Sequence, residues 1–226
     1  MNTKRNLIVA IDGLAGSGKS TTAKLTAKRL GYLHIDTGAM YRAVALKMLR
    51  SGIEIGDSAA IEDMLSDTAV SEREADGQTI VLLDGEDVTD EIRTPEISLW
   101  VGPVSEHALV RKHLVTWQRQ LGKQGGVVLE GRDIGTVVFP DADVKVYMVA
   151  DLKTRAKRRR KEMLTRGIDQ PAADIELALE QRDLRDITRE NSPLRKAADA
   201  TEIDTTDMTI GDQVDAVVEL VKKAEH

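Results

Sequence analysis

The spacing of apolar positions at the start of the chain predicts a strand, a helix and a second strand in succession. Residues 6–11 form a short apolar run that ends in Asp-Gly, which is typical of a buried strand. The pattern over Lys19–Leu30 predicts a helix that stops at Gly31, and residues 32–36 predict the second strand. A further helix is predicted over Thr37–Arg50. This order favours a parallel α/β sheet.

An insertion then interrupts this order. The next core strand, VVLEG, begins at Val127, and 90 positions separate it from Asp36, whereas a βαβ crossover needs only about 30 residues. Within the insertion, alternating apolar positions around Asp76-Gly77 predict a hairpin at about residues 66–90. A helical segment containing Trp100 and a longer helix over about 103–121 follow. The insertion is therefore predicted to be an α+β subdomain.

After VVLEG the α/β pattern resumes. Strands are predicted at residues 144–150 and 201–206, and helices at residues 152–166, 172–188 and 210–223. The apolar face of the last helix contains Val214, Val217, Val218 and Val221. The predicted fold is a three-layer α/β sandwich around a five-stranded parallel sheet. Residues 1–36 and 126–226 form its core, and residues 37–125 form the inserted region.

Composition excludes several classes of protein. The 226 residues include no cysteine, so disulfides and thiolate metal sites are excluded, and the four histidines lack metal-ligand spacing. No apolar run is long enough to span a membrane, and the first apolar run leads into a glycine loop rather than a cleavage site, so we expect a cytoplasmic protein. The net charge of −6 argues against nucleic acid as the main partner. Residues 152–166 are the exception, with eight basic residues and one acid.

The stretch GLAGSGKS, residues 13–20, matches the phosphate-binding pattern G-x-x-x-x-G-K-[ST] and lies between a predicted strand and a predicted helix. Glycines let successive backbone N–H groups point toward a polyphosphate at the helix N-terminus. The lysine then reaches the outer phosphates, and the serine can bind Mg²⁺. The residues predicted to bind ATP here are Gly13, Gly16, Ser17, Gly18, Lys19, Ser20 and Thr21.

Arginines recur beside the predicted phosphate-facing ends of strands and helices. Arg42 follows DTGAMY, and Arg132 and Asp133 follow VVLEG at the end of a strand. Two further groups have helical spacing: Arg155, Arg158 and Arg159, and Arg182, Arg185 and Arg189. One guanidinium group can bind two oxygens of a phosphate at the same time. Several arginines near the phosphate loop therefore suit a reaction with two anionic substrates, and the pattern favours phosphoryl transfer from ATP to a nucleoside monophosphate.

Two alternatives remain at this stage. The acceptor could be another small phosphate compound, such as a uridylate or an adenylate. The chain could also be a non-catalytic nucleotide-binding or RNA-binding protein that uses the basic helix.

Several stretches, in order and over nearly the whole chain, resemble bacterial cytidylate kinases. They are IDGLAGSGKST, DTGAMYR, DEIRTPEIS, LEGRDIGTVVFPDA, RAKRRRKEML and QRDLRDITRENSPL. The resemblance implies an ATP-dependent kinase of CMP and dCMP in pyrimidine nucleotide metabolism that uses Mg²⁺, held by Ser20 together with water. It also implies a monophosphate-binding role for residues 37–125 and a helical lid at about residues 152–170. We expect the protein to be a monomer.

The resemblance assigns roles at matching positions. Lys19, Arg132 and Arg159 are implied as catalytic, and Arg155 and Arg158 as further ATP-binding residues. CMP-binding roles are implied for Asp36, Thr37, Arg42, Arg111, Arg132, Asp133, Arg182, Asp186 and Arg189. Arg111 and Asp133 would address the cytosine, because a carboxylate accepts from its amine and a guanidinium donates to N3 or O2.

Two positions depart from the family pattern. Leu14 stands where the family usually has proline, and Gly102 stands where it commonly has a serine that contacts the base.

Overall fold

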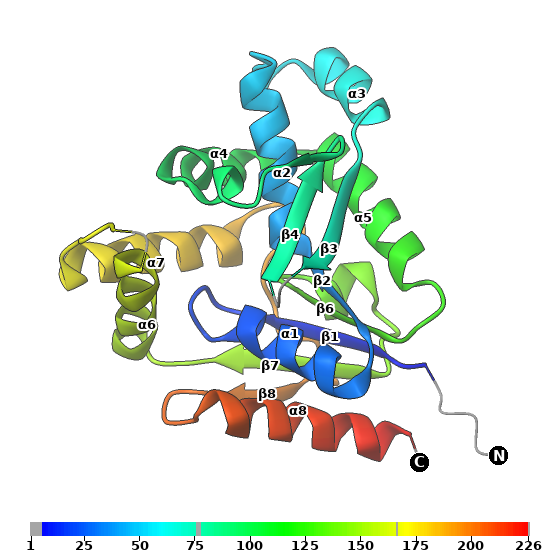
Figure 1. Ribbon diagram of the computed structural model, residues 1–226, viewed down its shortest axis with the longest axis vertical. Coiled ribbons are helices and arrows are strands. Elements are labelled where there is room, and N and C mark those ends of the chain that lie inside the picture. The colour runs from blue at the N-terminus through cyan, green and yellow to red at the C-terminus, as the bar shows by residue number, and fades with distance from the viewer. Residues whose placement is uncertain (1–5, 76–77, 166, 226) are drawn as a thin grey trace. The chain divides into compact units, whose positions relative to one another are not determined.

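The computed structural model describes residues 6–75, 78–165 and 167–225, and these form two compact units (Figure 1). The first unit contains the residues up to Ile35 and those from Gly122 onward, and the second is Asp36–Leu121. The predicted turn Asp76-Gly77 and the predicted helix end Arg166 lie outside the described residues.

The first unit is built on a five-stranded sheet in the order β2-β6-β1-β7-β8. The strands are β1 (Ile8–Gly13), β2 (Leu33–Asp36), β6 (Val127–Gly131), β7 (Val144–Val149) and β8 (Thr201–Asp204). β1 pairs in parallel with β6 and β7, and β7 pairs in parallel with β8. Asp12 is in register with Gly131, so the loops after β1 and β6 leave the same edge of the sheet. The predicted α/β fold with a five-stranded parallel sheet is confirmed.

Two helices, α1 (Lys19–Leu30) and α8 (Ile210–Ala224), share an apolar core with the sheet. Its buried members include Val9, Ile11, Val146, Val217 and Val221. All four valines predicted for the apolar face of α8 are buried. α8 begins with a capping box in which Thr209 and Asp212 bond reciprocally, which fixes its first turn.

The remaining helices of this unit, α6 (Leu152–Leu164) and α7 (Ala172–Thr188), pack together through a second small core. Its buried residues are Ala15, Ala156, Ile175 and Leu179. Ala15 lies in the loop between β1 and α1, so this helix pair packs directly against the glycine-rich loop. A short π-helical segment, η2 (Ile134–Val138), follows β6.

The second unit is α+β. Its elements are α2 (Thr37–Arg50), α3 (Ser58–Ser66), β3 (Val70–Ala75), β4 (Gln78–Leu83), β5 (Glu86–Asp87), η1 (Glu91–Arg93), α4 (Pro95–Glu106) and α5 (Ala108–Gly122). β3 and β4 form the predicted antiparallel hairpin, and β5 adds a short third strand. The sequence pattern did not predict α3, a helix of nine residues that Asp57 caps by accepting from the Ala60 N–H at 3.0 Å.

The predicted start of the second helix of the insertion at residue 103 is wrong. Pro103 lies inside α4, which begins after the Thr94 cap with Pro95 in its first turn, and the break falls at His107. Pro103 cannot donate to the carbonyl of Leu99, and both residues lie on the exposed side of the helix, where the proline ring disturbs no core packing. No helix in the part of the chain that the structure describes is long and apolar enough to cross a membrane.

Candidate active site

The loop between β1 and α1 has the backbone of a phosphate-binding loop. Gly13 has φ 144°, and a Cβ there would come within 2.0 Å of the Met148 carbonyl oxygen, so only glycine fits beside β7. Gly18 is the N-cap of α1 in the left-handed conformation. A Cβ there would meet Gln213 Oε1 at 2.7 Å. The N–H groups at the start of α1 and the helix dipole therefore face the loop, as an anion site requires.

Lys19 opens α1 and is almost fully buried. Its Nζ donates to the Leu14 carbonyl within the same loop at 2.7 Å. Burial, together with the positive charge of Arg132, lowers the pKa of Lys19 to about 7. The loop thus holds a lysine that a nearby polyphosphate would return to its charged form.

Ser20, next along α1, donates its hydroxyl hydrogen to Glu130 Oε2 at 2.6 Å. A hydroxyl has one hydrogen and two lone pairs, so this bond leaves the Oγ lone pairs to face a cation. Mg²⁺ prefers oxygen ligands and usually takes few from the protein and the rest from phosphates and water. No cluster of three or more acidic or histidine side chains in the described part of the chain forms a complete metal cage. The donor set therefore fits Mg²⁺ that arrives with a nucleotide.

Asp12, at the end of β1, connects the phosphate loop strand to the segment after β6. Its carboxylate accepts from the backbone N–H of Ile134 at 2.8 Å and of Gly135 at 2.7 Å. Burial raises the pKa of Asp12 to about 6 despite these two bonds. The Asp12 carboxylate thereby fixes the residues that directly follow Arg132 and Asp133.

Predicted arginines and acids from β6 and α7 gather in ion pairs. Arg132 Nε donates to Asp186 Oδ2 at 2.7 Å, and Arg189 Nη2 lies 3.5 Å from Asp133 Oδ1. Burial alone would raise the pKa of Asp186, but Arg132 and then Arg182 outweigh it and hold this pKa below its usual value. Arg132 and Arg182 also act on Lys19, which places this cluster close to the phosphate loop.

The other four predicted acceptor-binding residues belong to the second unit. Asp36 caps α2 by accepting from the Ala39 N–H at 2.9 Å, and Arg42 Nη2 lies 3.3 Å from Asp36 Oδ2. Thr37, the first residue of α2, is buried. Arg111 is also buried; its Nη1 donates to the Ser105 carbonyl at 3.2 Å, and its guanidinium lies 5.8 Å from the centroid of the Tyr41 ring.

The three predicted arginines of α6 lie in different surroundings. Arg155 is buried and donates to Asp183 Oδ2 at 2.6 Å, to the Ala15 carbonyl at 3.2 Å and to the Ala150 carbonyl at 3.0 Å. Arg158 donates to the carbonyl and hydroxyl of Thr205. Arg159 pairs with Glu162 at 2.9 Å on the exposed side of the helix. Arg155 and Arg158 are thus already held against the core.

Several side chains that were not predicted from the sequence support the phosphate loop. Thr205 donates to the Ser17 carbonyl at 2.8 Å, and Thr22 donates to Gln213 Oε1 at 2.8 Å. No sequence motif identifies Thr205 or Gln213 as functional residues, because they lie far from the loop in the chain and contact it only in the folded structure. Asp12 and Glu130 were visible as acids at the ends of apolar strands, which is the pattern of a buried functional carboxylate.

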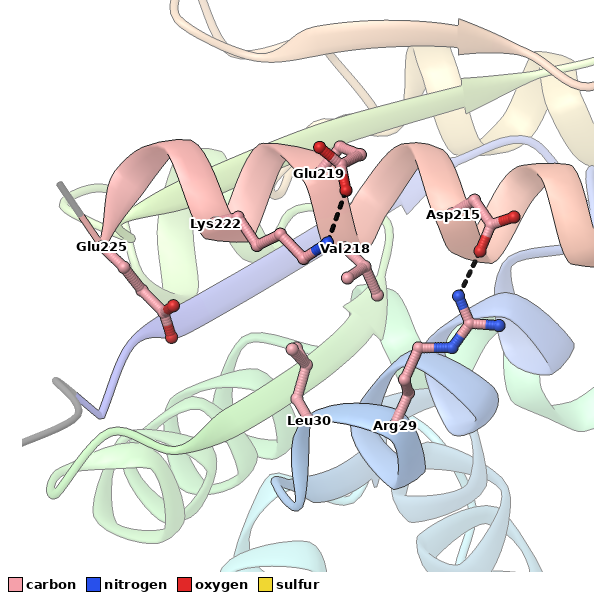
Figure 2. Close-up of a pocket in the computed structure, with 7 residues that line it drawn as sticks. All are labelled: Arg29, Leu30, Asp215, Val218, Glu219, Lys222 and Glu225. Carbon is pink, nitrogen blue, oxygen red and sulfur yellow. Dashed lines mark hydrogen bonds and ion pairs between the residues drawn. The ribbon is translucent and has the colours of Figure 1, made fainter.

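A surface hollow of about 530 Å³ lies between the C-terminal end of α1 and α8 (Figure 2). The ion pair Arg29–Asp215 joins α1 to α8 across the hollow, and the ion pair Lys222–Glu219 lies along α8. These four charges are therefore already paired. Arg29 and Leu30 end the helix that Lys19 begins, so the phosphate loop lies about 16 Å away along the helix axis, from a rise of about 1.5 Å per residue. The hollow is not part of the candidate active site.

The phosphate loop, its buried lysine and the neighbouring arginines define the class of this protein: it is a P-loop kinase. A shikimate kinase structure from Acinetobacter baumannii has a similar fold, with a TM-score of 0.50, 15% identity, and coverage of 97% of this chain and 95% of that chain.

The family model named "Cytidylate kinase" matches residues 9–223, and the chain belongs to the cytidylate kinase family. A cytidylate kinase of Caldicellulosiruptor saccharolyticus is 47% identical and covers 97% of each chain. One of Chloroherpeton thalassium is 50% identical over 96% of this chain and 93% of that protein.

Proposed function

We propose that this chain transfers the γ-phosphate of ATP to CMP or dCMP, giving CDP or dCDP and ADP. The observation that carries the proposal is the arginine cluster beside the phosphate loop. Arg132 and Arg182 both act on the buried Lys19, and Arg132, Asp186, Arg189 and Asp133 are joined in ion pairs at the end of β6. An acceptor phosphate bound there would be near the outer phosphates of ATP.

The roles of the chain's own groups follow from their charge. The phosphate loop and Lys19 hold the donor phosphates, while Arg132, Arg42 and Arg159 stabilise charge that spreads over the transferring group. The acceptor is itself a phosphate and is ionised near neutral pH, so positioning rather than a strong general base promotes the reaction. When bound at Ser20, Mg²⁺ supplies further neutralisation of the donor phosphates.

Base selectivity is assigned to Asp133 and Arg111. Cytosine offers an amine that a carboxylate can accept and ring acceptors to which a guanidinium can donate, and uracil reverses this order at two positions. A site built for cytosine would leave polar groups unpaired with uracil, which costs affinity. Gly102 lies in α4, where its carbonyl accepts from the Ser105 hydroxyl at 2.8 Å.

The test is a panel of CMP, dCMP, UMP, AMP and GMP, each assayed with ATP and Mg²⁺. We expect the highest kcat/KM for CMP and dCMP, and a loss of cytosine preference in Asp133→Ala. Asp141→Ala, an exposed acid in the loop after η2, is the matched control and should keep the preference. Equal use of UMP and CMP by the wild-type chain would indicate a kinase of broader acceptor range. Salt-sensitive RNA binding without turnover would indicate the binding-protein alternative.

A further inference from the structure

The carboxylate of Glu130 is contacted from two sides in the core of the first unit. Oε2 accepts from the Ser20 hydroxyl at 2.6 Å, and Oε1 lies 3.3 Å from His34 Nε2. Glu130 is only 4% exposed, so this arrangement is set by neighbouring side chains rather than by solvent. Because a carboxylate only accepts hydrogen bonds, His34 must carry a proton at Nε2 for this contact.

The three residues come from three separate elements. His34 lies on β2, Glu130 on the adjacent strand β6, and Ser20 in the first turn of α1. A chain of contacts therefore runs from an outer strand of the sheet to the Ser20 hydroxyl in the first turn of α1.

Two cations compete for the same carboxylate. Glu130 raises the pKa of both Lys19 and Arg132 electrostatically, so both positive charges attract it. The contact between Oε1 and His34 Nε2 is a second attachment point for the carboxylate, so it limits rotation of Glu130 away from the hydrogen bond that Oε2 accepts from Ser20.

We propose that His34 is a positioning residue for metal-bound nucleotide. By holding Glu130, it keeps the Ser20 hydroxyl turned so that its hydrogen points to Glu130 and its lone pairs point to the cation. The proposal rests on the proposed function only in assigning Mg²⁺ to Ser20, and it adds a residue that would act on the cation through Glu130 and Ser20.

The test measures ADP affinity by calorimetry, with Mg²⁺ and with EDTA, in the full chain. The quantity of interest is the ratio of the two dissociation constants, which is the gain that Mg²⁺ provides. We expect His34→Leu to reduce this gain about fivefold, the worth of one net hydrogen bond, and to leave metal-free affinity unchanged. His34→Gln, whose amide can still donate to Glu130, should restore most of the gain, whereas His34→Asn is too short and should not.

Two further variants separate positioning from general damage. In Ser20→Ala the gain should fall, and adding His34→Leu should lower it no further, because His34 acts through Ser20. His113→Leu removes a histidine on α5, in the second unit, and should leave the Mg²⁺-dependent gain in ADP affinity unchanged. If His34→Leu does not fold, the comparison of His34→Gln with His34→Asn carries the test.

Nitrogen NMR of the neutral protein provides a second readout, with the proton of His34 expected on Nε2. An unchanged Mg²⁺ gain in both His34→Leu and His34→Asn, or a proton on Nδ1 alone, would overturn the proposal. If the wild-type chain did not phosphorylate CMP, the proposed function would be overturned instead. The His34 test would still stand, because binding of ADP and Mg²⁺ is measured without CMP.

Discussion

At the scale of single residues, the most informative group is Lys19, because its charge depends on whether phosphate is bound. Burial and the charge of Arg132 lower its pKa to about 7. A polyphosphate in the loop supplies negative charge within a few ångströms, which favours the protonated form. The lysine should therefore gain a proton when nucleotide binds above neutral pH.

The prediction is proton uptake on ATP binding at pH 8.5, where Lys19 with a pKa of about 7 is mostly neutral. We expect uptake of about one proton per ATP, because one lysine changes state. Calorimetry in two buffers of different ionisation enthalpy measures it. Lys19→Met should abolish the buffer dependence, and Lys28→Met, an exposed lysine of the same helix, should retain it. Equal heats in both buffers for the wild-type chain would contradict this prediction.

At the scale of elements, a buried ion pair joins α6 and α7 beside their small apolar core. The side chains of Arg155 and Asp183 are only 6% and 12% exposed, and their charged atoms lie 2.6 Å apart. Arg155 also donates to the Ala15 carbonyl in the phosphate loop. The first turns of α6 are thus joined to the loop, whereas Arg159, further along α6, pairs only with an exposed neighbour in the contacts described above. Lid motion, if it accompanies catalysis, should begin beyond Arg155.

The prediction at this scale concerns Asp183→Asn. Removing one partner leaves the Arg155 charge buried and uncompensated, so the free energy of unfolding should fall by about 3 kcal/mol. The KM for ATP should rise as the contact to the phosphate loop loosens. Urea unfolding and steady-state kinetics are the measurements. Asp174→Asn, an exposed acid in the first turn of α7, should change stability by less than about 0.5 kcal/mol. An equal loss in the free energy of unfolding in the two variants would show that the buried Arg155–Asp183 pair contributes no more to stability than an exposed acid does.

At the scale of the whole molecule, the predicted acceptor site divides between the two compact units. Asp36, Thr37, Arg42 and Arg111 belong to Asp36–Leu121, while the other five predicted residues belong to the unit that carries the phosphate loop. Binding of CMP should therefore be visible in each unit separately.

The corresponding prediction is measured by hydrogen exchange with CMP and a non-hydrolysable ATP analogue. We expect slower exchange of backbone amides near residues 37–42 and 108–114 in the second unit, and near 132–138 in the first. ATP analogue alone should protect the phosphate loop and leave 108–114 unchanged. Arg132→Ala should reduce the CMP-dependent protection in both units, whereas Arg119→Ala, on an exposed part of α5, should leave it intact. Protection confined to one unit would contradict the acceptor-binding roles predicted for the residues of the other unit.

Local patterns were sufficient for the strands, most helices and the phosphate loop. The glycines at 13 and 18 and the lysine at 19 are close in the chain, so their chemistry could be recognised from spacing alone. The end of α4 was misplaced because proline is usually a strong start or stop, and here an exposed turn of helix tolerates it. α3 was missed because it is a short helix of nine residues, for which local propensity is a weak guide.

The sequence by itself determined the class of fold, the phosphate loop and the set of arginines, because strand and helix periodicity and a contiguous motif are local properties. The tertiary structure decided which charges pair: Arg155 with Asp183, Arg132 with Asp186, and Glu130 with Ser20 and His34. These partners lie 28, 54 and 96 or more positions apart in the chain. Only burial in a common core brings them within hydrogen-bond distance, and the same burial shifts the pKa values of Lys19 and Asp12.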